Sequence, residues 1–120
     1  MTPPIIVLIV EDEPLVRMDI SDQLQDFGFK VHEAANAAEA IEMLEANSGI
    51  RIMFTDVDMP GSMDGLMLAA AVRDRWPPIK IIVTSGHREV SMRDLPVDGR
   101  FFGKPYHADM VAAAMKEMVR

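Results

Sequence analysis

The sequence predicts an α/β protein in which five parallel strands form one doubly wound sheet with helices on both faces. Five short apolar runs alternate with segments whose apolar residues recur every three or four positions. Continuous apolar runs are typical of parallel strands, because helices bury both faces of such a sheet. We expect strands at about 5–10, 30–34, 51–56, 79–84 and 100–102.

Two helices are expected in the first half of the chain. The first runs from about Pro14 to Phe27 and ends at Gly28, since glycine is a common helix stop signal. Its apolar stripe consists of Val16, Ile20, Leu24 and Phe27. The second begins at Asn36, which together with Glu39 three positions later resembles a capping box.

The second half is expected to hold two further helices with a weaker segment between them. One runs from about 64 to 75 and ends before Trp76-Pro77-Pro78, because proline cannot continue a helix. The other runs from about 107 to 119. Few apolar residues lie between them at 88–96, and Pro96 interrupts the pattern, so this helix is expected to be short or irregular.

Composition narrows the functional classes. A chain of 120 residues is expected to form one domain that spans residues 1–120. A formal charge of −7 disfavours a nucleic-acid partner, which would require clustered Lys and Arg. The chain has no cysteine, which excludes disulfides and thiolate metal sites and suits the cytoplasm. No run approaches the ~20 apolar residues of a membrane span, so no membrane partner is expected.

Polar residues end or directly follow four of the expected strands. Glu11 and Asp12 follow the first strand, Asp56 ends the third, Thr84 ends the fourth and Lys104 follows the fifth. Open α/β sheets bind their ligands at the carboxyl ends of their strands. We therefore expect these side chains to converge at one edge of the sheet.

The chemistry of this set indicates phosphoryl transfer. Glu11, Asp12 and Asp56 repel one another unless a pKa rises or a cation is bound between them. A set of oxygen ligands alone favours Mg²⁺ over zinc. Lys104 adds a positive charge and Thr84 a hydrogen-bond donor, as phosphoryl transfer requires around the transferred oxygens. Asp56 is the expected nucleophile, which would become an aspartyl phosphate.

The motifs resemble, in their order, those of the receiver domain of two-component response regulators, of which the bacterial chemotaxis regulator is a single-domain example. They are Glu11-Asp12, Asp56 with Met59-Pro60 and Asp64-Gly65, Thr84-Ser85, and Lys104-Pro105. The similarity covers residues 5–119 and implies a flavodoxin-like strand order 2-1-3-4-5. It also implies a phosphohistidine donor on a histidine kinase or histidine phosphotransfer protein, and a downstream protein target. Such a domain is slowly autodephosphorylating and is not a turnover enzyme.

The resemblance also implies a role for each residue of the metal and acceptor site. Asp56 would accept the phosphoryl group. Asp12 would bind Mg²⁺ directly and Glu11 through water, and the backbone carbonyl of Asp58 would complete the metal shell. The side chain of Asp58 lies near the position from which water would attack, so it is expected to tune the lifetime of the phosphoryl group.

The remaining roles concern the conformational change. Lys104 would pair with Asp56 and then with the phosphoryl group, and the Lys104-Pro105 bond is usually cis in this family. Thr84 and Phe101 match the switch positions. Phosphorylation would bias a two-state surface made of the fourth helix, the fifth strand and the fifth helix.

The sequence departs from the receiver pattern at two places, and two alternative functions remain. The segment from Pro60 to Gly65 is one residue longer than the commonest form of this loop, and the fourth helix is degenerate. In one alternative the chain is a haloacid-dehalogenase-like phosphatase, with Asp56-Val57-Asp58 as its nucleophile motif, although that family's nucleophile strand normally comes first. In the other, the chain is a receiver-like binding module that no longer uses phosphate.

Overall fold

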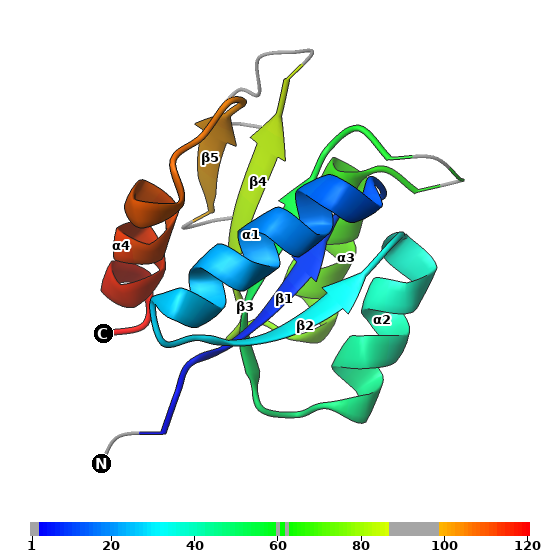
Figure 1. Cartoon of the computed structure of the whole chain (residues 1–120). Helices are drawn as coiled ribbons and strands as arrows, with labels where there is room; N and C mark the ends of the chain where they lie inside the picture. The colour runs from blue at the N-terminus through cyan, green and yellow to red at the C-terminus, as the bar shows by residue number, and fades with distance from the viewer. Residues whose placement is uncertain (1–2, 60, 62, 87–98) are drawn as a thin grey trace.

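A computed structural model of the chain describes residues 3–59, 61, 63–86 and 99–120 (Figure 1). Within these residues, five parallel strands form one sheet in the order β2-β1-β3-β4-β5. The strands are β1 Ile6–Val10, β2 Lys30–Ala34, β3 Ile50–Asp56, β4 Lys80–Ser85 and β5 Arg100–Gly103. The helices of this part of the chain are α1 Pro14–Asp26, α2 Ala37–Ala46, α3 Gly65–Arg75 and α4 Ala108–Met118. The predicted doubly wound sheet and its strand order are confirmed.

The boundaries of the elements agree closely with the apolar runs. Each strand begins and ends within one residue of its predicted position. The short or irregular helix predicted at 88–96 lies outside the described residues. Among the helices that the structure describes, none is long and apolar enough to cross a membrane.

Helices cover both faces of the sheet, α1 and α4 one face and α2 and α3 the other (Figure 1). Strand β1 contributes side chains to the hydrophobic core on both faces of the sheet, because its successive side chains point to opposite faces. Val7 and Ile9 pack with α1 and α4, whereas Leu8 and Val10 pack with α2 and α3. All four are fully buried, which explains why the strand is continuously apolar.

Helix α1 ends just before the predicted glycine, but one residue that was expected in the core is exposed. Gly28 has a φ of +96°, which favours glycine. Phe27 was predicted to continue the apolar stripe, yet its side chain is 40% exposed. The helix ends at Asp26, so Phe27 lies past the last turn and no longer follows the helical spacing. Phe29 is the buried phenylalanine here, and it packs with Leu24.

Side chains cap the N-termini of the two helices on the second face of the sheet, α2 and α3. The Asn36 side chain accepts a hydrogen bond of 2.9 Å from the Glu39 amide, as the capping box predicts. The Glu39 carboxylate accepts its return bond from the backbone amide of Ala35 rather than from that of Asn36, and it also accepts a 3.4 Å bond from the Asn36 side chain. Asp64 caps α3 by accepting a 2.9 Å bond from the Met67 amide. This second cap places the start of α3 beside the end of β3.

We predict that Leu24→Ala and Leu15→Ala differ strongly although both lie on α1. Leu24 is fully buried in the core and Leu15 is 81% exposed. Leu24→Ala is expected to lower the free energy of unfolding by about 2–5 kcal/mol, since it leaves a cavity. Leu15→Ala should change it by no more than about 0.5 kcal/mol. Urea unfolding measures both, and equal effects would contradict this assignment of the helix faces.

Candidate functional site

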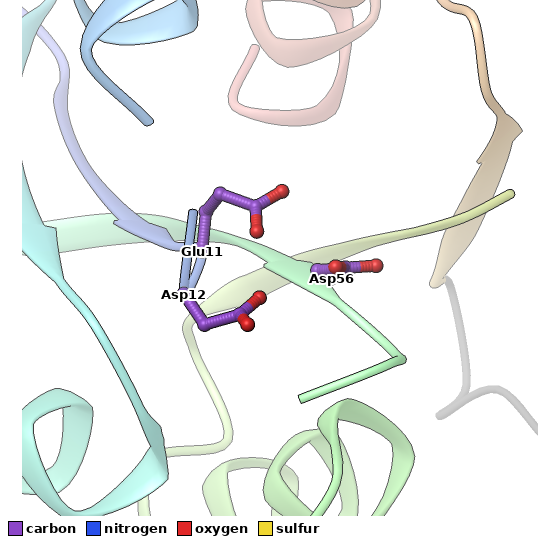
Figure 2. A group of neighbouring side chains, drawn as sticks. All are labelled: Glu11, Asp12 and Asp56. Carbon is purple, nitrogen blue, oxygen red and sulfur yellow. The ribbon is translucent and has the colours of Figure 1, made fainter. Parts of the chain in front are cut away.

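Three carboxyl groups meet at the carboxyl ends of β1 and β3 (Figure 2). Glu11 and Asp12 follow β1 directly, and Asp56 is the last residue of the neighbouring strand β3. A carboxylate oxygen from each residue lies within 4.8 Å of those of the other two. Glu11 and Asp56 are both only 4% exposed, whereas Asp12 is partly exposed. The predicted convergence of these residues therefore holds, and the group could bind a metal ion.

Lys104 reaches the same group from the end of β5. Its ammonium lies 3.2 Å from an oxygen of Glu11 and 3.2 Å from an oxygen of Asp56. The Lys104 amide donates a 3.0 Å hydrogen bond to the carbonyl of Ser85, which ties the residue to β4. The Lys104-Pro105 peptide is cis, as the resemblance implied. One ammonium group thus pairs with two buried carboxylates at the ends of two other strands.

The electrostatic balance of this group leaves an excess of negative charge. Burial raises the pKa of Asp56, and the nearby Lys104 opposes this only in part. Burial is also the main reason why the pKa of Glu11 is raised, and the hydrogen bond to Asp12 adds to it. For Lys104, burial acts to lower the pKa, but the charges of Asp56 and Glu11 outweigh burial and raise it. A second cation would relieve both carboxyl groups.

Thr84 lies beside Asp56 in the parallel ladder of β3 and β4. Its carbonyl accepts a 2.8 Å hydrogen bond from the Val57 amide. Its hydroxyl is buried and has no hydrogen-bond partner among the residues that the structure describes. A buried hydroxyl without a partner costs free energy. It is therefore available to donate to an incoming acceptor at Asp56.

The loop between β3 and α3 folds back tightly against the acceptor strand. The Asp58 amide points toward an Asp56 carboxylate oxygen at 3.4 Å. The Val57 carbonyl accepts hydrogen bonds from the amides of Met59, at 3.1 Å, and Gly65, at 3.0 Å. A Cβ atom on Gly65 would overlap the carbonyl oxygen of Asp56, so glycine is required there for steric reasons.

Residues 7–114 match the response regulator receiver domain family. The chain belongs to this family. It is 43% identical over 117 residues to the sensor kinase CckA of Brucella abortus (strain 2308), which covers 94% of the chain and 12% of that protein. It is 28% identical over 116 residues to the receiver protein CpdR of the same strain, covering 94% of the chain and 95% of CpdR.

Solved receiver structures are similar in fold. A receiver protein from Sinorhizobium medicae WSM419 has a TM-score of 0.89 at 26% identity, covering 97% of this chain and 94% of the other. The receiver domain of the hybrid histidine kinase CckA has a TM-score of 0.80 at 29% identity, covering 96% and 99%. The chain spans less than a quarter of the length of some curated relatives, such as the sensor kinase above. None of these similarities supports the phosphatase or the phosphate-independent module.

Other residues around the receiver site were not singled out by the sequence. Arg17 on α1 donates to the Glu11 carbonyl at 2.8 Å and to the Glu33 carboxylate at 3.2 Å, so it fixes the end of β1. The only sequence signal was its place one turn after the acidic run. Tyr106 packs edge-on against Phe54 with ring centroids 5.4 Å apart, and burial raises its pKa to about 12.

Phe101 and Asp58, the two other residues that the sequence singled out, also lie close to the acceptor strand β3. Phe101 is partly buried and packs against the α2 and α3 side of the core. It pairs with Val83, the residue before Thr84. Asp58 contacts Ser85, whose hydroxyl donates a 2.8 Å hydrogen bond to its carboxylate. That bond was not predicted, because it depends on the path of the loop after β3.

In the absence of metal, we predict that Asp56→Asn raises the free energy of unfolding at neutral pH. Burial raises the pKa of Asp56 above its ordinary value of 3.8. Such a carboxyl stabilises the folded state at low pH, and this contribution is lost as the pH rises through the folded pKa. The advantage of the asparagine variant should therefore appear above about pH 4 and shrink below it.

Urea unfolding in EDTA across this pH range measures the effect. Asp22→Asn is the matched control, because it removes the same charge from an exposed position on α1. It should show no comparable gain. An Asp56→Asn variant that is less stable than the wild type at neutral pH would contradict this account of the site.

Proposed function

We propose that Asp56 is the phosphoacceptor of this receiver and takes its phosphoryl group from a phosphohistidine. The donor would be a histidine kinase or a histidine phosphotransfer protein, in keeping with the two-component family to which the chain belongs. The observation that carries the proposal is the placement of the Asp56 carboxylate, 3.2 Å from the Lys104 ammonium and beside two further carboxylates. A nucleophile, a fixed cation and a set of oxygen ligands thus meet at one point.

The residues of the site would share the work of the transfer. An Asp56 oxygen attacks phosphorus, the N–P bond of the phosphohistidine breaks, and its electron pair returns to the imidazole. The Lys104 ammonium neutralises charge on the transferred oxygens, since it already lies within ion-pair distance of the nucleophile. The Thr84 hydroxyl, which has no partner among the described residues, donates to one of those oxygens.

Mg²⁺ is the proposed cofactor. Asp12, Asp56 and the backbone carbonyl of Asp58 would hold it directly, and Glu11 would do so through water. The donor set fits this ion because it contains only oxygen and because its carboxylates lie within 4.8 Å of one another. When bound, the ion supplies positive charge that offsets the repulsion between the carboxylates and the phosphoryl oxygens.

The output of the domain would be a protein contact. Phe101 and Thr84 act as the switch in this proposal, and their strands support it because Phe101 pairs with the residue next to Thr84. A shift of Thr84 toward the phosphoryl group would therefore also displace Phe101. We further propose that residues 1–120 act as one receiver domain in the cytoplasm, with a downstream protein partner and without multiple turnover.

We predict that Mg²⁺ stabilises the folded receiver through Asp12. A ligand that binds only the folded state adds about 2.7 kcal/mol at 100 times its dissociation constant. Asp12→Asn removes one proposed ligand and should lose most of that gain, whereas Asp22→Asn should keep it. Urea unfolding at increasing Mg²⁺ measures the effect. Equal stabilisation of both variants would mean that Asp12 does not hold the metal.

We also predict that acetyl phosphate adds a single phosphoryl group to the chain. Intact mass spectrometry after incubation with acetyl phosphate and Mg²⁺ should show one adduct, which EDTA and Asp56→Asn each abolish. Asp22→Asn should retain it. An adduct that survives in the Asp56→Asn variant would assign the acceptor to another residue. Continuous release of phosphate without a lasting adduct would favour the phosphatase alternative.

A further inference from the structure

A hollow of about 370 Å³ lies at the edge of the sheet where β3 and β4 begin. This edge is opposite to that of Asp56, which is the last residue of β3. The residues that line the hollow are Ser48, Ile50, Arg51, Pro78, Lys80, Met118, Val119 and Arg120. Pockets for small molecules range from about 300 to 1,000 Å³, so a hollow of this size suits a small ligand.

Positive charge is concentrated in the lining of this hollow. Three of the eight lining residues are cations, and none of those eight is acidic. The whole chain, in contrast, has 19 acidic and 12 basic residues. Lys80 and Arg120 form no ion pair among the residues that the structure describes. The nearby Glu117 is already paired with Arg100 at 3.1 Å. A cleft lined by one sign of charge attracts the opposite sign, so the hollow favours an anion.

A β-bulge sets the direction of Arg51. The register between β1 and β3 shifts by one residue between Ile6 and Val7, which leaves Arg51 as an extra residue in β3. Such a bulge redirects a side chain from the face to which regular alternation would send it. The Arg51 guanidinium donates a 3.1 Å hydrogen bond to the Val119 carbonyl, just after α4. This bond uses one of the five donors of the guanidinium, and the remaining donors are suited to an anion.

The other half of the lining is apolar. It consists of Ile50, Pro78, Met118 and Val119. Except for Ile50, these side chains are exposed or only partly buried, so a ligand would remove apolar surface from water. The charge of the ligand follows from the three cations, since a phosphate monoester carries about −1.5 to −2 near neutral pH. The lining thus matches a ligand with a phosphate at one end and an apolar group at the other.

We propose that this hollow binds a small phosphate monoester, with its phosphate on the three cations and its organic group against the apolar residues. Arginine binds phosphate through two parallel hydrogen bonds, and lysine adds a point charge. The site lies at the far edge of the sheet from Asp56, so the inference does not depend on the proposed role of Asp56 as the acceptor.

The test uses phenyl phosphate as the probe and follows the backbone amides of the chain by NMR. The titration is made in EDTA, because the carboxylates around Asp56 then repel anions. Phenyl phosphate should produce saturable shifts at residues 48–51, 78–80 and 118–120. Phenol should produce none there, and inorganic phosphate should bind more weakly, because it leaves the apolar residues in water. Equal affinity for phenyl phosphate and for either control would overturn the assignment of an ester.

Variants of the cations locate the phosphate. Arg51→Gln and Lys80→Gln should each weaken the binding of phenyl phosphate about tenfold or more, since each loses a hydrogen bond to a charged group. Lys80→Arg should retain binding. Lys30→Gln is the matched control, because Lys30 is likewise the first residue of a strand but does not line the hollow. Its affinity should equal that of the wild type.

The opposite outcomes are equally specific. The absence of saturable shifts, or an unchanged affinity in Lys80→Gln, would overturn the inference. Asp56→Asn should bind phenyl phosphate as tightly as the wild type does. A loss of binding in Asp56→Asn would place the probe at the acceptor edge and would overturn the site proposed at the start of β3 and β4. The amide spectrum of each variant without ligand shows whether it is folded, and Lys80→Arg against Lys80→Gln still decides if Arg51→Gln is not.

Discussion

The pairing of Lys104 with Glu11 and Asp56 is the interaction on which the rest of the site depends. Three charged groups at the ends of three strands are held in a largely buried space, with the ammonium 3.2 Å from each carboxylate. Buried charges are costly unless they are paired, so this arrangement requires the three strand ends to be held in place. The strand order meets that requirement, because β1 and β3 are neighbours and the long lysine side chain reaches them from β5.

Most of the fold could be predicted from the sequence because two independent signals agree. Apolar runs located the strands, and polar residues after them indicated which strand ends share an edge. The predictions that were wrong concern local details. Phe27 fits the helical spacing but lies past the point where α1 ends, so its side chain is exposed. The Glu39 carboxylate of the capping box accepts from the backbone amide of Ala35 instead of that of Asn36, since such bonds depend on the backbone path before the helix.

The candidate site was predictable for residues at strand ends and not for contacts between loops. Glu11, Asp56 and Lys104 come together because the topology of the sheet brings them together. The contacts of Ser85 with Asp58 and of Arg17 with the Glu11 carbonyl depend on how a loop turns and on side-chain rotamers. No periodicity encodes these features. The steric need for glycine at the start of α3 is likewise visible only from the atoms that approach it.

Two groups of the site are suited to further partners. Burial raises the pKa of Asp56, and the Thr84 hydroxyl has no partner within the described residues. A metal ion and a phosphoryl group at Asp56 would supply partners for both: positive charge for the carboxylates and an acceptor for the hydroxyl. The free energy gained in this way would depend on where Thr84 lies, and so would favour one position of β4 over another. Since Phe101 pairs with the residue next to Thr84, that preference would reach the edge strand β5 without any direct contact with the phosphoryl group.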